Sequence, residues 1–266
     1  MRHVLSLSGG KDSAALAIYM RDRVPEMEYI FSDTLKELPE TYAYLDSIED
    51  YLGKPVHRLN ADLGFDHWYD VYGGMIPSNH RRWCTKMLKL KPFEDFVGDS
   101  PVVNYVGLRA DEQRAGYVST KPNITAVYPF QEHGLKLGDI EEILRVSGVG
   151  MPPYTRWGRT RSGCFFCFYQ QKIEWVRLKE KYPELYEKAK AYEKPYEASG
   201  NTFTWSERES LTELERPERM EAIKDEHERR KRARETSGAD LTLAEVYRRR
   251  EAAAEDEGDA CLICTL

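Results

Sequence analysis

The chain has 266 residues, 41% of them apolar, which is enough to form the core of one large α/β domain or of a domain with an appendage. Its 39 basic and 45 acidic residues give a formal charge of -6, which excludes a general attraction for nucleic acid or acidic membranes and confines anion binding to local sites. The first ten residues contain no apolar stretch followed by a cleavage site. No stretch approaches the roughly 20 apolar residues of a membrane span, so we expect a cytoplasmic protein.

Apolar and β-branched runs alternate with helical patterns over the first 150 residues. This alternation is typical of an α/β fold in which crossover helices join parallel strands. The clearest helix follows Pro39 and places Tyr42, Leu45, Ile48 and Leu52 on one face, so we expect it to lie on the sheet. The predicted strands are residues 3–7, 29–31, 56–59, 102–106 and 124–127.

The pattern changes near residue 150, where the loop GRTRSGCFFCFYQQ leads into a predicted helix with Trp175, Leu178 and Tyr182. Pro183 either ends this helix or opens the next one. From Ser206 onward the chain is mostly charged, and capping-box patterns predict helix starts at 206–209, 210–213 and 242–245. We therefore expect three parts: a first domain over 1–150, a cysteine-containing loop and helix packed on it over 151–205, and a charged helical appendage with a C-x-x-C tail over 206–266.

The stretch LSLSGGKDSAALAIYM, residues 5–20, predicts a strand, a tight turn and the beginning of a helix. Backbone N–H groups at a helix N-terminus bind phosphate well. The turn does not match G-x-x-x-x-G-K-[ST], because Leu5 replaces the first glycine and Asp12 follows Lys11. It does not match the dinucleotide fingerprint either, because only the adjacent Gly9 and Gly10 are present. An ordinary Gly-Gly turn beside a surface lysine is the alternative.

SGGKDS after a first strand resembles the motif of the ATP pyrophosphatases, the PP-loop branch of the adenine-nucleotide α-hydrolase fold. The resemblance implies a parallel sheet flanked by helices, and cleavage of MgATP between its α and β phosphates. It assigns Lys11 and Asp12 to catalysis, with Asp12 capping the turn or helping Mg²⁺. The phosphate ligands that it implies are Ser8, Gly9, Gly10, Lys11 and Ser13.

The segment FSDTLKELPETYAYLD, residues 31–46, resembles the Asp-Thr-Gly and Pro-Glu-Thr motifs of the sulfonucleotide reductases and their relatives. In this phosphoadenylylsulfate-reductase-like subgroup the region meets the nucleotide. The resemblance therefore makes Asp33 and Thr34 expected nucleotide ligands at the C-terminal end of a strand. Leu35 stands where these relatives usually have glycine.

Two further segments resemble motifs of the same subgroup: RRWCTKMLKLKPFEDF at 81–96 resembles its Cys-Thr…Lys…Pro segment, and YVGLRADEQRAGY at 105–117 resembles its Gly-x-Arg…Arg segment. Guanidinium groups suit phosphate because they form two parallel hydrogen bonds, although pairing with a carboxylate is an equal alternative for each arginine. We expect Arg81 and Arg82 to bind the nucleotide, and Arg109 and Arg114 to take part in catalysis.

An odd number of cysteines in a chain expected to be cytoplasmic favours metal or redox chemistry over disulfides. Cys164 and Cys167 form a C-x-x-C pair, whose thiolates can reach one metal centre. In related sulfur-inserting PP-loop enzymes three cysteines bind a [4Fe-4S] cluster, so the resemblance implies that Cys84 joins this pair. A long-range zinc site and a buried pair without a metal remain alternatives.

The C-terminal tail carries less specific signals. Cys261 and Cys264 form a second C-x-x-C pair, for which sulfur relay, cluster completion and no role at all stay open. The tail lacks the Glu-Cys-Gly-Leu-His type of ending of the true sulfonucleotide reductases, which counts against reduction of activated sulfate. Basic runs at 228–235 and 247–251 are better explained as solvated helices than as a contact with nucleic acid.

The combination of SGGKDS, RRWCT and SGCFFCFYQQKIEW resembles the ATP-pyrophosphatase component of bacterial DNA phosphorothioation systems over residues 1–185. This resemblance implies that ATP with Mg²⁺ adenylates an acceptor oxygen, best assigned to the DNA backbone phosphate. Sulfur from a cysteine desulfurase then displaces AMP, so DNA and the desulfurase are expected partners. The alternatives are tRNA thiolation, reduction of an adenylyl sulfate (PAPS or APS), and a non-catalytic nucleotide-binding subunit.

Overall fold

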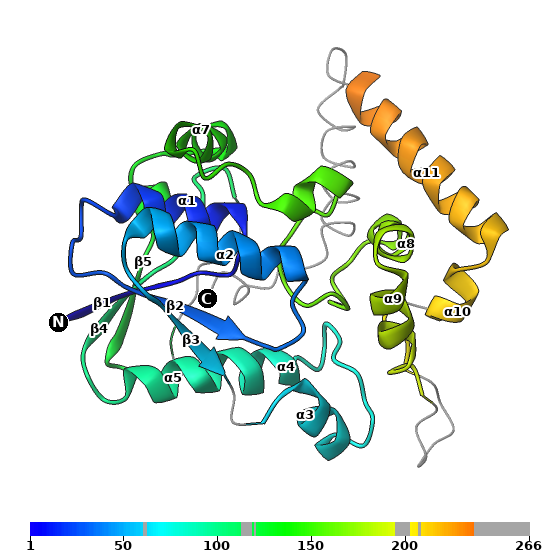
Figure 1. Cartoon of the computed structure of the whole chain (residues 1–266), viewed down its shortest axis with the longest axis horizontal. Helices are drawn as coiled ribbons and strands as arrows, with labels where there is room; N and C mark the ends of the chain where they lie inside the picture. The colour runs from blue at the N-terminus through cyan, green and yellow to red at the C-terminus, as the bar shows by residue number, and fades with distance from the viewer. Residues whose placement is uncertain (61–62, 113–118, 120, 195–202, 207–208, 237–266) are drawn as a thin grey trace, which may run out of the picture. The chain divides into compact units, whose positions relative to one another are not determined.

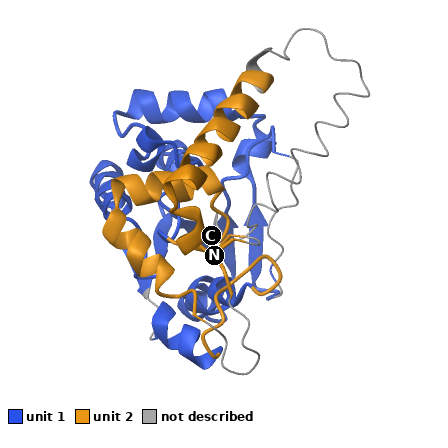
Figure 2. Ribbon diagram, turned by 90° about the vertical axis from the view of Figure 1, so that its right-hand side faces the viewer, with its two compact units in different colours: residues 1–72, 82–165, 261–266 blue, residues 73–81, 166–260 orange. Residues whose placement is uncertain are grey.

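The structure is a computed structural model that describes residues 1–60, 63–112, 119, 121–194, 203–206 and 209–236. The described residues form two compact units (Figure 2). The first unit holds Met1–Tyr72 and Arg82–Phe165, and the second holds Gly73–Arg81 and the described residues from Phe166 onward. Each unit has its own core.

Five parallel strands form the sheet of the first unit, in the order β3-β2-β1-β4-β5 (Figure 1). Each strand lies within two residues of its predicted range, and the parallel sheet flanked by helices confirms the predicted α/β fold class. The strands are β1 (Arg2–Ser6), β2 (Glu28–Asp33), β3 (Val56–Asn60), β4 (Val102–Tyr105) and β5 (Ile124–Val127).

Successive strand residues alternate between two cores, one on each face of the sheet. Leu5, Tyr29 and Phe31 lie in the core that also contains buried residues of α1, α2 and α7. Val4 and Ile30 lie in the core that contains residues of α5. This burial on both faces is what a parallel sheet with crossover helices requires.

The helices of the first unit begin and end where the sequence supplies suitable residues. In α2, Pro39 occupies the first turn, where its missing N–H is not needed, and Gly53 ends the helix with a φ of 64°. This confirms the helix predicted after Pro39. The helical segments are α1 (Lys11–Met20), α2 (Pro39–Leu52), α3 (Phe65–Val71), α4 (Trp83–Thr85), the π-helical turn η1 (Lys86–Leu90), α5 (Lys91–Val97), α6 (Pro129–Glu132), α7 (Leu137–Ser147) and the 3-10 segment η2 (Pro153–Trp157).

Aromatic side chains form the core of the second unit. Trp205 stacks on Phe166 with 4.9 Å between ring centroids, and its Nε1 donates to the carbonyl of Ala189 at 2.8 Å. The predicted helix with Trp175 is confirmed, and Pro183 opens the helix that follows it. The helices are α8 (Lys172–Lys181), α9 (Pro183–Lys190), α10 (Leu211–Leu214) and α11 (Pro217–Thr236).

The predicted helix starts of the charged segment have different outcomes. The capping box at Ser210 is confirmed, since Ser210 Oγ accepts from the N–H of Glu213 and the Glu213 carboxylate accepts from the N–H of Ser210. The start predicted at Ser206 is wrong, because Ser206 and Glu209 form an isolated antiparallel bridge instead. The pattern at 242–245 lies outside the described residues, and the predicted domain boundaries stay predictions. No helix in the described part of the chain has both the length and the apolar character needed to cross a membrane.

Candidate nucleotide site

The strand order of the sheet reverses between β1 and β4. The chain proceeds from β1 through β2 to β3 toward one edge of the sheet, and from β4 to β5 toward the other. In open parallel sheets, ligands bind beyond the C-terminal ends of the strands at such a switch point. The segments that follow β1 and β4, residues 7–10 and 106–109, therefore define the candidate site.

Two glycines allow the backbone segments of this site to approach closely. Gly9 has a φ of 69°, and a Cβ atom there would stand 2.5 Å from Cγ2 of Thr41. A Cβ atom on Gly107 would stand 3.0 Å from the carbonyl oxygen of Asp12. Because a backbone atom cannot swing aside, a larger residue at position 107 would displace the start of α1.

Hydroxyl groups surround the N-terminus of α1. Ser13 Oγ accepts from the N–H of Ser8 at 3.1 Å, donates to the carbonyl of Gly10 at 3.2 Å, and lies 3.1 Å from Ser8 Oγ. The first N–H groups of an α-helix have no partners within the helix, and here no side chain caps them. They point out of the helix start, where the helix dipole is positive. Lys11 adds a cation in the first turn. This combination of hydroxyls, helix N-terminus and lysine is one that suits an anion.

Arg109, at the end of the segment after β4, binds three carboxylates. Its Nη1 lies 2.8 Å from Asp12 Oδ1 and 2.8 Å from Glu112 Oε1, and its Nε donates to Asp111 Oδ1 at 3.0 Å. Partial burial lowers the pKa of Arg109, but the three carboxylates outweigh that effect and hold its pKa above the ordinary value. The predicted catalytic residues Arg109 and Asp12 thus lie together, and Asp12 binds an arginine.

Asp33 and Thr34 lie at the C-terminal end of β2, on the same edge of the sheet. Asp33 Oδ1 accepts from the N–H of Leu35 at 2.8 Å and from the hydroxyl of Tyr42 at 2.7 Å, so this carboxylate shapes the turn. Leu35 has a φ of 59°, in the left-handed region that costs residues with a side chain about 1–2 kcal/mol. The position where relatives have glycine is therefore one whose backbone conformation favours glycine.

Thr34 links the thiol of Cys164 to a buried carboxyl group. Its Oγ1 donates to Glu37 Oε1 at 2.9 Å and lies 3.1 Å from Cys164 Sγ. Glu37 is 7% exposed, and its Oε2 has no hydrogen-bond partner among the described residues. Burial raises the pKa of Glu37, against the opposing charges of Lys89 and Arg159. The Glu37 carboxyl group therefore keeps its proton to higher pH than a solvated glutamate.

The remaining predicted site residues fall in different parts of the structure. Arg82 is the N-cap of α4 and Cys84 lies on that helix, both in the first unit, whereas Arg81 and Cys167 belong to the second unit. Within the described part of the chain, no group of three or more His, Cys, Asp or Glu side chains is arranged to hold a metal ion. The cluster on Cys84, Cys164 and Cys167 stays a prediction. Outside the described residues lie Arg114, Cys261 and Cys264.

Three residues of this region were not predicted as site residues, although they lie within or beside the quoted motifs. Ser162 Oγ donates to Ser8 Oγ at 3.3 Å, although 154 positions separate the two serines. Arg159 is 1% exposed and donates through Nη2 to the carbonyl of Cys164 at 2.6 Å. Glu37 is the third. The one clue in the sequence is their position: Glu37 lies inside the 31–46 motif, and Ser162 and Arg159 lie within five residues of Cys164.

Comparisons with known proteins agree with this fold. The structure of phosphoadenylyl-sulfate (PAPS) reductase from Candida auris, a phosphate complex, matches with a TM-score of 0.51 and 14% identity, over 62% of this chain and 81% of that chain. An uncharacterized protein of Methanocaldococcus jannaschii is 27% identical over 199 residues, 70% of this chain and 40% of its own length. Adenosine 5'-phosphosulfate reductase of Staphylococcus haemolyticus is 28% identical over 110 residues, 41% of this chain and 45% of its own length.

The family assignment follows from the N-terminal part of the chain. The chain spans less than half of the length of each of these two curated relatives. The model of the phosphoadenosine phosphosulfate reductase domain matches residues 2–136, which include all five strands of the sheet and the loop at the N-terminus of α1. The chain belongs to the phosphoadenosine phosphosulfate reductase domain family.

Proposed function

We propose that this protein is an ATP pyrophosphatase, which transfers AMP from MgATP to an acceptor oxygen and releases pyrophosphate. The observation that carries the proposal is the uncapped N-terminus of α1 at the switch point of the sheet, with the hydroxyls of Ser8 and Ser13 beside it. Such a helix start suits the β and γ phosphates of a nucleotide. Lys11 supplies the positive charge that pyrophosphate needs as it leaves.

The proposed reaction depends mainly on positioning and on charge. The acceptor oxygen attacks the α phosphorus, a new oxygen–phosphorus bond forms, and the bond between the α and β phosphates breaks with its electron pair on pyrophosphate. Lys11 and the N–H groups of α1 stabilise that developing charge. Mg²⁺ usually binds nucleotide phosphates and one or two carboxylates, and Asp12, which Arg109 holds in the first turn of α1, is the carboxylate that fits.

We propose the DNA backbone phosphate as the acceptor, on the strength of the RRWCT and SGCFFCFYQQKIEW motifs. The terminal sulfur of a persulfide from a cysteine desulfurase attacks the phosphorus of the adenylated acceptor, and AMP leaves with the original oxygen. A thiol then attacks the remaining S–S bond, so the phosphorothioate leaves with the electron pair and a disulfide forms on the carrier. An iron–sulfur cluster held by Cys84, Cys164 and Cys167 would bind and activate the incoming sulfur. Mass spectrometry of nuclease-digested DNA and tRNA, from cells with and without the gene, tests the acceptor. Loss of phosphorothioate from DNA without the gene supports DNA as the acceptor. Loss of a thio-base from tRNA instead would make tRNA the acceptor.

Reduction of an adenylyl sulfate is the second candidate, because the family model that matches residues 2–136 is that of a phosphoadenosine phosphosulfate reductase domain. Binding measurements separate the two functions. Tighter binding of ATP than of adenylyl sulfates supports the pyrophosphatase, and the reverse order supports the reductase.

The substitution Lys11→Ala tests the proposed chemistry. We expect this variant to fold normally and to lose pyrophosphate release from MgATP by at least about 100-fold, because no other residue offers a cation in the first turn of α1. Pyrophosphate is measured with a coupled phosphate assay in the presence of acceptor and sulfur donor. The control is Lys91→Ala, which removes an exposed lysine paired with Asp95 on α5 and should leave turnover unchanged. Normal turnover by Lys11→Ala would refute the assignment.

A further inference from the structure

Residues 158–164 bring a hydroxyl group to the phosphate loop from a distant part of the sequence. Ser162 Oγ donates to Ser8 Oγ at 3.3 Å, and Ser8 Oγ lies 3.1 Å from Ser13 Oγ. A Cβ atom on Gly10 would stand 2.9 Å from Ser162 Oγ, so Ser162 lies directly against the backbone at the start of α1. Three hydroxyl groups thus form a continuous row at the end of the helix where an anion binds.

The backbone of residues 158–164 is held in place at several points within the first unit. Arg159 donates through Nη2 to the carbonyls of Gly163 at 3.1 Å and Cys164 at 2.6 Å, which closes the loop. Gly163 has a φ of 125°, a conformation that other residues rarely adopt. The N–H of Phe165 donates to the carbonyl of Lys36 at 2.8 Å, which fixes the loop to the turn after β2. Ser162 is therefore positioned by the backbone, and only its hydroxyl has to turn to meet a ligand.

Arg159 gives an independent sign that this loop meets a group from outside the chain. It is 1% exposed, yet its Nε and Nη1 have no hydrogen-bond partner among the described residues. Buried polar groups almost always have partners, and an unpaired guanidinium nitrogen is costly. An acceptor-rich ligand beside residues 158–164 would satisfy such donors. A nucleotide's terminal phosphates provide acceptors and no strong donors.

We propose that Ser162 is a phosphate ligand of the nucleotide site and donates its hydroxyl to a terminal phosphate oxygen of ATP. The Ser162 hydroxyl turns from Ser8 Oγ to the phosphate, and residues 158–164 form a second wall of the site beside the SGGKDS loop. This proposal rests on the proposed binding of ATP at the N-terminus of α1. It extends the set of phosphate ligands beyond the family motif, to a residue outside the segment that matches the family model.

The test compares binding of MgATP and of inorganic pyrophosphate to four full-length proteins by calorimetry. These are the wild type, Ser162→Ala, Ser162→Thr and the control Ser47→Ala, whose hydroxyl donates to Ala43 within α2. We expect Ser162→Ala to weaken both ligands about tenfold, the usual effect of losing one hydrogen bond to a charged group. Ser162→Thr keeps the donor and should restore most of the affinity. Circular dichroism spectra should be the same for all four proteins.

The outcomes separate this inference from the proposed function. If wild type binds ATP and Ser162→Ala binds it equally well, the role of Ser162 is refuted while the pyrophosphatase proposal stands. If Ser162→Ala and Ser162→Thr lose affinity equally, the loss comes from packing, and the ligand role is refuted as well. If wild type binds neither MgATP nor pyrophosphate, both the inference and the proposed function fail.

Discussion

At the scale of single residues, Glu37 shows how the fold sets the protonation of one group. Burial raises the pKa of its carboxyl group in the folded protein above the ordinary value of 4.5. A group with a raised pKa stabilises the fold below its unfolded pKa, and this contribution is lost as the pH rises through the folded pKa. The wild-type protein should therefore lose stability as the pH rises from 4.5 through the raised pKa of Glu37.

The substitution Glu37→Gln removes the charge and keeps an acceptor for the hydroxyl of Thr34. We expect the variant to gain stability relative to wild type as the pH rises, by roughly 1–3 kcal/mol once wild-type Glu37 is ionised, because an ionised buried carboxylate with an unpaired oxygen is costly. Urea unfolding at several pH values measures the difference. The control Asp50→Asn, at an exposed position of α2, should follow the wild-type profile. A constant difference between Glu37→Gln and wild type across this pH range would contradict the prediction.

Single residues also show why part of the site could be predicted from the sequence and part could not. SGGKDS is local: six consecutive residues specify the turn, the donors and the start of α1. Leu35 could be noticed as a departure from glycine, but its left-handed backbone is visible only in the structure. Ser162 and Arg159 depend on contacts between distant segments, and neither composition nor periodicity records such contacts.

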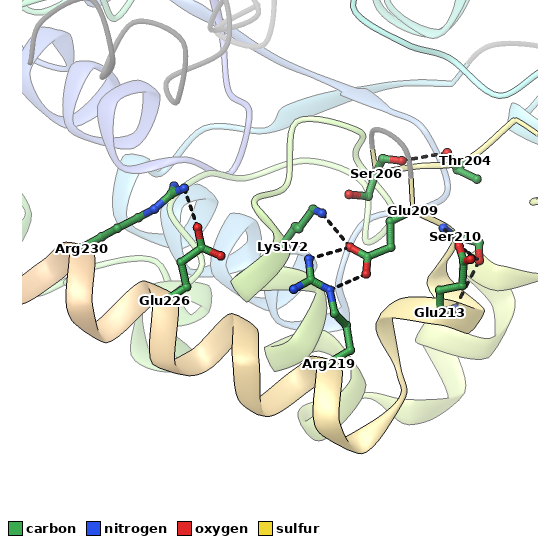
Figure 3. A network of polar contacts seen from close by, with 9 residues as sticks. All are labelled: Lys172, Thr204, Ser206, Glu209, Ser210, Glu213, Arg219, Glu226 and Arg230. Carbon is green, nitrogen blue, oxygen red and sulfur yellow. Dashed lines mark hydrogen bonds and ion pairs between the residues drawn. The ribbon is translucent and has the colours of Figure 1, made fainter. Parts of the chain in front are cut away.

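At the scale of elements, Glu209 joins α8 and α11 to the segment before α10 (Figure 3). Lys172 donates to its carboxylate at 2.6 Å, and Arg219 donates through both Nε and Nη2. The hydrogen bond from Arg219 is the largest influence that holds the pKa of Glu209 below its ordinary value. The ionised Glu209 carboxylate therefore stabilises the fold above its unfolded pKa, and this contribution is lost as the pH falls through its folded pKa.

We expect Glu209→Gln to lower the free energy of unfolding by about 1–2 kcal/mol at pH 7, because two cations lose their carboxylate. The control is Glu226→Gln. Glu226 forms one ion pair with Arg230 along the surface of α11, at 2.8 Å, and exposed pairs of this kind contribute less than about 0.5 kcal/mol (Figure 3). Urea unfolding measures both variants. Equal effects of the two substitutions would show that the contacts of Glu209 add nothing beyond a surface pair.

The elements themselves were predictable to different degrees. Strands of the first unit follow short apolar runs that bury both faces, so their positions could be predicted within two residues. In the charged segment the same capping pattern marks a true helix start at Ser210 and a β-bridge at Ser206. The difference is tertiary, because the Glu209 carboxylate binds Lys172 and Arg219, on α8 and α11, and so does not cap a helix.

At the scale of the whole molecule, the division into two compact units predicts where a nucleotide acts. A ligand stabilises the cooperative unit that holds its site, by about 2.7 kcal/mol at 100 times its Kd. Because the phosphate loop, Arg109 and Ser162 all belong to the first unit, saturating MgATP should slow the slowest amide exchange of β1, β2 and α1 by up to about 100-fold. Exchange in α10 and α11 should stay unchanged, as should exchange throughout the Lys11→Ala variant. Hydrogen exchange followed by mass spectrometry measures the exchange rates of all these elements, in wild type and in the variant. Equal slowing in α10 and α11 would mean that the two units unfold together, and the stability gained at the phosphate loop would then be shared by the entire chain.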